Sequence, residues 1–150
     1  MQPHPDFETV TLPRSLRLAS CELTPLAPDF SQEDYDVVME AAHLLSAGPG
    51  EWPDGLTLAE NAIDLAWHER EFTVKRSFSW ILRDSAGAYL GCFYIYPAMG
   101  ARGAAKVVLW VRARPDREAL CRVLKEELEA WTAEALPAGI ALDWHCNPAV

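Results

Sequence analysis

Three arginines, Arg112, Arg114 and Arg117, surround one turn in the stretch VVLWVRARPDREAL of residues 107–120. The apolar run before the turn predicts a β-strand, and the run after it predicts the start of a helix. The first N–H groups of a helix lack backbone partners and carry partial positive charge, so they attract anions. Guanidinium groups beside them offer donors suited to phosphate. The turn therefore predicts a site for a phosphorylated small ligand, or else the arginines are solvated or pair with Asp116 and Glu118.

The charge balance excludes some classes of partner. The chain has 150 residues, with 22 acidic and 13 basic side chains and a net charge of −9. Such a chain repels phosphate backbones, and no basic run with interleaved aromatics offsets the charge, so nucleic acid is not expected as a partner. No segment approaches the roughly 20 apolar residues of a membrane helix, and no apolar leader is present, so we expect no membrane association.

The cysteines give no sign of a metal site or of a disulfide framework. The four cysteines are widely spaced, and no CxxC pair or paired Cys/His spacing occurs. Zinc sites usually show such pairs, so no metal is expected. The thiols are typical of small buried side chains in a reducing compartment, which predicts a cytoplasmic protein.

The length and the pattern of residues predict one domain over residues 1–150. Prolines at positions 3, 5 and 13 indicate a loose N-terminal arm over residues 1–14. Weak alternation predicts a strand over 15–23. A helix is expected over 31–46, capped by Ser31 with Asp34 as the acid of a capping box, and a second over 57–72, with Thr57 and Glu60 as its capping box.

The second half of the chain changes to a period of two. Three antiparallel strands are expected over residues 77–84, 88–97 and 106–113, then a long helix over 115–136 and a last strand over 140–145. The predicted order is β-α-α-β-β-β-α-β, which is typical of an α+β fold.

This order, together with LGCFYIYP and the later VVLWVRARPDREALCRVLKEELEAW, resembles the GNAT N-acetyltransferase superfamily. The superfamily signature is Arg or Gln, two residues, Gly, one residue, then Gly or Ala, at the turn from the fourth strand into a helix. In RPDREA, residues 114–119, Arg114 and Ala119 match, and Arg117 replaces the central glycine. The resemblance spans residues 15–145. It implies a GNAT-like mixed, mostly antiparallel sheet with helices on both faces, in a C-terminally shortened member.

The resemblance also implies where acetyl-CoA, the acyl donor, would bind. Its pantetheine would pair with the backbone of the fourth strand at Leu109, Trp110 and Val111, where the fourth and fifth strands are expected to splay apart. Its pyrophosphate would lie on the turn and helix start. The residues expected there are Arg114, Asp116, Arg117, Glu118, Ala119 and Leu120.

Acetyl transfer to an amine also needs groups that move protons. Glu69, Glu71 and His68, near the end of the second helix, are candidate bases; the alternative is a solvated helix face. Tyr94 and Tyr96, on one face of a strand, are candidate proton donors; the alternative is that they only pack. No covalent nucleophile with a neighbouring base can be identified from spacing.

Two functions therefore remain open. The first is an acetyl-CoA-dependent N-acyltransferase that acts on a small amine or aminoacyl acceptor. The second is a non-catalytic GNAT-like module that binds CoA or dimerises, because a short last strand would leave a sheet edge for a second copy to cover.

Overall fold

A computed structural model describes all 150 residues and contains one sheet of six strands, in the order β1-β2-β3-β4-β5-β6. The strands are β1 (Leu16–Arg17), β2 (Glu22–Pro25), β3 (Phe78–Arg83), β4 (Tyr89–Pro97), β5 (Ala104–Val111) and β6 (Ala141–Asn147). The helices are the 3-10 helix η1 (Pro28–Phe30), α1 (Ser31–Glu40), α2 (Ala42–Leu45), α3 (Leu58–Thr73) and α4 (Arg117–Ala135). Every neighbouring pair is antiparallel except β5 and β6, which are parallel. The mixed, mostly antiparallel α+β sheet is therefore confirmed.

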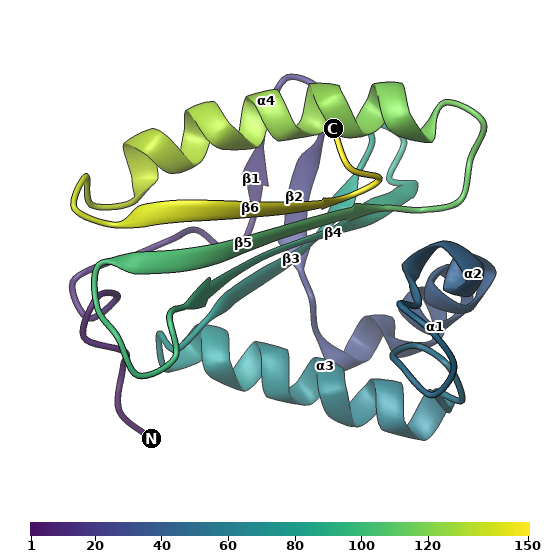
Figure 1. Ribbon diagram of the computed structural model, residues 1–150, viewed down its shortest axis with the longest axis horizontal. Helices are drawn as coiled ribbons and strands as arrows, with labels where there is room; N and C mark the ends of the chain where they lie inside the picture. The colour runs from purple at the N-terminus through teal and green to yellow at the C-terminus, as the bar shows by residue number, and fades with distance from the viewer.

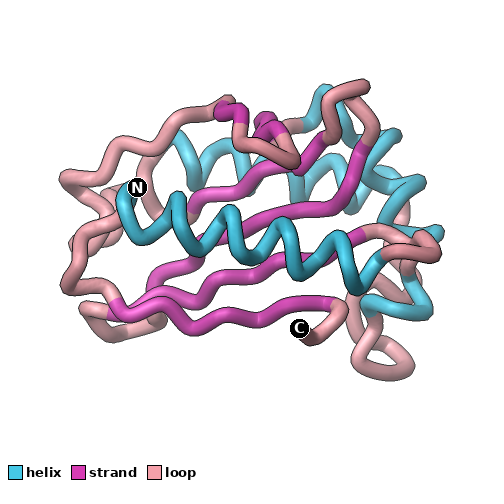
Figure 2. Tube along the Cα trace, turned by 90° about the horizontal axis from the view of Figure 1, so that it is seen from above, coloured by secondary structure: helices cyan, strands magenta, loops and turns pink.

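Helices cover both faces of the sheet, as expected (Figure 1). Helix α4 lies across one face, and α3 and α1 lie against the opposite face (Figures 1 and 2). Alternation along β3 divides its side chains between two core clusters. Trp80 is in the larger one and packs on Trp131 of α4 and on Phe72 near the end of α3, whereas Ile81 joins Leu65 of α3 in the smaller one. None of the helices combines the length and the apolar character needed to cross a bilayer.

The N-terminal residues are part of the packed structure, so the expectation of a loose arm is wrong. Phe7, Val10 and Leu12 are buried in the larger core, and the Phe7 ring lies 5.2 Å from that of Phe78. The Trp80 Nε1 also donates a hydrogen bond to the Pro13 carbonyl at 3.0 Å. The prolines prevent regular structure here, but burial of the apolar side chains still orders the segment.

The helices of the first half agree with expectation at the start of α3 and differ from it around α1. The capping box of α3 is confirmed, with the Glu60 N–H donating to Thr57 Oγ1 and the Thr57 N–H donating to the Glu60 carboxylate. The helix expected over 31–46 is instead divided into α1 and α2. Ser31 does not cap α1, because η1 leads directly into it and the Ser31 hydroxyl donates to the Pro28 carbonyl. Asp34 is buried rather than bonded to the helix end.

A close approach of two strands lies beside the β5–α4 turn. Gly91 of β4 pairs with Val111, the last residue of β5. A Cβ at Gly91 would lie 1.9 Å from the Trp110 carbonyl oxygen, so only glycine permits this spacing. The end of β5 is thereby held tightly against β4.

Candidate functional site

Strands β5 and β6 remain paired along their length. Their parallel register runs from Ala104 opposite Ala141 to Trp110 opposite Asn147. The expectation that these two strands splay apart near Leu109–Val111 is therefore wrong.

The side chain of Arg117 holds β5 and β6 together at the end of the pair. Its Nε donates to the Val111 carbonyl at 2.8 Å, and its Nη2 donates to the Asn147 backbone oxygen at 3.0 Å. Burial lowers the pKa of Arg117 from its ordinary value. The guanidinium thus joins the last residue of β5 to the last residue of β6. Glycine, the superfamily's residue at this position, has no side chain to do so.

The other two arginines of the turn also have partners. Arg114 forms a hydrogen-bonded ion pair with Asp116, which was one of the two alternatives expected from the sequence. The hydrogen bond from Arg114 holds the pKa of the Asp116 carboxyl below its usual value. Arg112 donates to Glu40 at 2.7 Å and to the Tyr89 carbonyl at 3.3 Å. None of the three guanidinium groups is left without a protein acceptor.

Two donors at the start of α4 remain available to a ligand. The amide N–H groups of Glu118 and Ala119 donate no hydrogen bond within the protein. Asp116 is the N-cap residue, but its side chain makes no capping hydrogen bond. The helix start can therefore contact an anion through its backbone, although the Asp116 and Glu118 carboxylates lie beside it.

A pocket of about 320 Å³ lies between α3 and strands β4 and β5. We call it the aromatic pocket; its lining residues are Trp52, Asp64, His68, Tyr94, Tyr96, Val108 and Trp110. Alternation along the strands brings Tyr94 and Tyr96 of β4 to the same face as Val108 and Trp110 of β5. On α3, Asp64 and His68 are one turn apart and face the same strands. The pocket adjoins Trp110, the residue before Val111.

The groups in the aromatic pocket are close enough to influence one another. His68 Nε2 lies 3.4 Å from an Asp64 carboxylate oxygen, and the His68 ring centroid lies 5.3 Å from that of Tyr94. Trp110 Nε1 donates to the Tyr94 hydroxyl at 3.4 Å. Tyr94 and Tyr96 stack nearly parallel, with their centroids 5.6 Å apart.

The protonation of these groups suits proton transfer. Burial raises the pKa of both Tyr94 and Tyr96, so each hydroxyl keeps its proton at neutral pH. The His68 side chain is only 13% exposed, and its Nδ1 is buried without a hydrogen-bond partner. The other ring nitrogen, Nε2, faces the Asp64 carboxylate.

The structure separates the candidate bases named from the sequence. His68 and Tyr94 meet in the aromatic pocket, and Glu71 bonds to the Ser77 hydroxyl in an adjoining hollow that shares Tyr96. Glu69 lines a different hollow, beside Phe72. No group of three His, Cys, Asp or Glu side chains is placed to hold a metal ion.

The predicted cofactor residues fall on two faces of β5. Trp110 lines the aromatic pocket, whereas Leu109 and Val111 are buried in the core that packs under α4. Sequence reasoning missed Asp64, Trp52 and Val108. The spacing of Asp64 and His68, one helical turn, was the one available signal.

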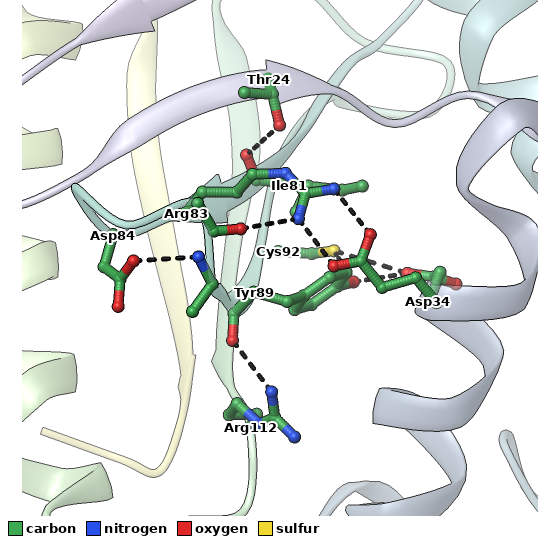
Figure 3. A network of polar contacts seen from close by, with 11 residues as sticks. Thr24, Asp34, Ile81, Arg83, Asp84, Tyr89, Cys92 and Arg112 are labelled. Atoms are coloured by element: carbon green, nitrogen blue, oxygen red, sulfur yellow. Dashed lines mark hydrogen bonds and ion pairs between the residues drawn. The ribbon is translucent and has the colours of Figure 1, made fainter.

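A buried polar cluster of Asp34, Asn61, Tyr89 and Cys92 holds α1 and α3 against β4. Figure 3 shows Asp34, Tyr89 and Cys92 of this cluster. Asp34 is 3% exposed; it accepts hydrogen bonds from the Tyr89 hydroxyl and, at 2.9 Å, from Asn61. Burial raises the pKa of Asp34, against the lowering effect of those hydrogen bonds. The Tyr89 hydroxyl also lies 2.8 Å from Cys92 Sγ. Because Asn61 is on α3, the cluster fixes the helix that carries Asp64 and His68.

No sequence-family model and no curated protein matches the chain. Several solved structures match the fold of the chain. One is RimL, the ribosomal L7/L12 alpha-N-protein acetyltransferase, in complex with coenzyme A, at 12% identity and a TM-score of 0.66, covering 82% of this chain and 68% of that one. Another is the microcin C7 self-immunity acetyltransferase MccE with acetyl-CoA and AMP, at 11% identity and a TM-score of 0.65, covering 82% and 68%. A third is the ribosomal-protein-S5-alanine acetyltransferase from Vibrio fischeri, at 12% identity and a TM-score of 0.64, covering 81% and 68%.

Identities this low establish a shared fold rather than a shared substrate. These three proteins are acetyltransferases. The mixed sheet of this chain agrees with the expected one, and so does the order of elements from α3 onward; the strand expected over 15–23 is instead the hairpin of β1 and β2. The chain therefore has the fold of the GNAT acetyltransferases.

Proposed function

We propose that this chain is an acyl-CoA-dependent N-acyltransferase that binds its amine acceptor in the aromatic pocket. The observation that carries the proposal is the pairing of His68 and Tyr94 in a pocket beside the end of β5, within a GNAT fold. Two of the matched acetyltransferases contain acetyl-CoA or coenzyme A, which supports a thioester as acyl donor.

The residues of the pocket suit the proton movements of the reaction. Acetyl-CoA, when bound, supplies an activated acyl group: the amine nitrogen bonds to the thioester carbon, and the carbon–sulfur bond breaks. We assign the His68 imidazole, which lines the pocket, to accept the proton that the amine loses. We assign the Tyr94 hydroxyl, which lines the pocket, to donate a proton to the departing thiolate.

The start of α4 suits the pyrophosphate end of acetyl-CoA, whereas the closed β5–β6 pair obstructs its pantetheine arm. The free N–H groups of Glu118 and Ala119 suit a pyrophosphate. A pantetheine arm between β5 and β6 requires the Arg117 side chain to leave the Val111 and Asn147 oxygens. This closure favours a second candidate function, a GNAT-like module that binds a ligand without transferring an acyl group.

Calorimetry and mass spectrometry distinguish the acyltransferase from the non-catalytic module. The chain is titrated with acetyl-CoA and CoA, then incubated with acetyl-CoA and a panel of small amines and peptides with free N-termini, and acetylated products are measured by mass. Binding with transfer supports the acyltransferase, and His68→Gln should then keep CoA binding while losing most of the transfer. Binding without transfer to any acceptor supports the second candidate. No heat at millimolar CoA would contradict the acyltransferase.

A further inference from the structure

We infer that the aromatic pocket selects a primary ammonium group attached to a small apolar or aromatic body. The inference rests on the proposed function only in taking this ligand to be the acyl acceptor. The selectivity itself is argued from the chemistry of the pocket walls.

The charge of the pocket favours a cation. Asp64 is the one carboxylate among its lining residues, and no lysine or arginine lines it. The chain as a whole carries a net charge of −9. Asp64 is 55% exposed, which places its carboxylate at the mouth, where it meets an incoming ammonium before the ligand is enclosed.

The aromatic side chains favour the same group. Tyr94 and Tyr96 are nearly parallel, with an interplanar angle of 10°, and Trp52 and Trp110 add two indoles to the wall. Aromatic faces attract ammonium groups electrostatically and also pack against apolar groups. The Trp110 N–H donates to the Tyr94 hydroxyl, so the indole donor offers little to a neutral polar ligand. A cation on an apolar body gains most from these walls.

The volume limits the body that can enter. A pocket of about 320 Å³ is at the small end of the range for ligand sites. It accommodates a single small amine or one N-terminal residue. The adjoining hollow of about 490 Å³, which shares Tyr96, provides an exit for a longer chain. A free amine and a peptide N-terminus share the required chemistry.

The test measures binding without CoA. Calorimetry measures the affinity of two pairs of ligands. The first pair is 2-phenylethylamine and neutral 2-phenylethanol. The second is a tetrapeptide that has a free N-terminal phenylalanine and the N-acetylated form of the same peptide. Amide NMR shifts at Tyr94, Val108 and Trp110 locate the ligand. Asp64→Asn removes the carboxylate and Tyr96→Leu removes one aromatic face. Glu126→Gln, an exposed residue of α4 on the opposite face of the sheet, is the control for loss of one negative charge.

We expect each amine to bind more tightly than its neutral partner. Asp64→Asn should weaken the amine about two- to fivefold, because an exposed charge pair contributes modestly. Tyr96→Leu should weaken it about two- to tenfold, and Glu126→Gln should leave it unchanged. Binding of the free amine alone identifies a small-molecule acceptor, and binding of the peptide alone identifies a protein N-terminus; either supports the inference. Equal binding of amine and alcohol, or no binding of either amine, would overturn it.

This test is separate from the test of acyl transfer. An amine that binds in the pocket but is never acetylated would contradict the proposed function and leave the selectivity standing. Acetylation of amines at rates that Asp64→Asn and Tyr96→Leu do not change would contradict the selectivity alone.

Discussion

Arg117 donates hydrogen bonds to both the backbone oxygen and the side-chain Oδ1 of Asn147, at 3.0 and 2.6 Å. Asn147 is the last residue of β6, and the same guanidinium bonds to Val111 at the end of β5. The resemblance to GNAT proteins places the pantetheine of the acyl donor at this position. On the proposed function, Arg117 and the acyl donor would therefore compete for the same strand ends.

Arg117→Ala should loosen the end of the β5–β6 pair. Loss of charge-assisted hydrogen bonds to the strand ends should cost about 1–3 kcal/mol of unfolding free energy and speed amide exchange in residues 144–147. The same variant should bind CoA more tightly, because its competitor is gone. Arg122→Ala, which removes an exposed ion pair with Glu118 one turn further along α4, is the matched control. Weaker CoA binding in Arg117→Ala would show that Arg117 contacts the ligand instead.

Arg114→Ala tests the anion site at the start of α4. Arg114 is partly exposed and pairs only with Asp116, so it can turn toward a phosphate. The variant should bind CoA about three- to tenfold more weakly, as expected for loss of one charged contact. Binding of a pantetheine fragment without phosphate should be unaffected. Equal losses for CoA and the fragment would exclude a phosphate contact.

Gly91→Ala should destabilise the protein strongly. The new Cβ would lie 1.9 Å from the Trp110 carbonyl oxygen, so β4 and β5 would have to separate next to the aromatic pocket. We expect a loss of about 2–4 kcal/mol in urea unfolding. Gly139→Ala, where no atom lies within 4 Å of the added Cβ, should change stability by only a few tenths of a kcal/mol. Similar midpoints for the two variants would contradict the close approach.

The buried Asp34 predicts an unusual dependence of stability on pH. Its pKa is raised above 3.8 in the folded protein, mainly by burial, so the folded state holds the proton more tightly than the unfolded state. The resulting stabilisation is present below pH 3.8 and is lost as pH rises through the folded pKa. Relative to Asp34→Asn, the wild-type protein should therefore lose stability as the pH rises from 3.8 toward neutral values.

Urea unfolding of both proteins at several pH values in that range measures this difference. Asp36→Asn, at an exposed position on the same helix, is the control for loss of one carboxylate. A stability difference for Asp34→Asn that is independent of pH, or that changes in the opposite direction, would contradict the raised pKa.

Features that depend on neighbouring residues could be predicted from the sequence. The Thr57–Glu60 capping box is confirmed because its partners are three residues apart, and the strands of the second half followed from alternation and turns. The pairing of Arg114 with Asp116 was also among the alternatives, for the same local reason. The predicted cap at Ser31 failed because the preceding 3-10 turn, which no pattern indicated, changes how the helix begins.

Features that join distant segments appeared only in the tertiary structure. Asp34 resembles a helix-capping acid in the sequence, but its partners Asn61 and Tyr89 lie 27 and 55 residues away. The aromatic pocket likewise draws on a loop, one helix and two strands.

The sequence alone determined the order of elements in the second half of the chain, the likeness to the GNAT superfamily and the arginine-rich turn, because these depend on periodicity and short-range bonding. Only the tertiary structure decided that Arg117 reaches Asn147, 30 residues away, and that β5 and β6 are closed where a cleft was expected. The partner of a long, charged side chain depends on which acceptors the fold brings within its reach. The residues next to it in the sequence do not reveal which acceptors those are.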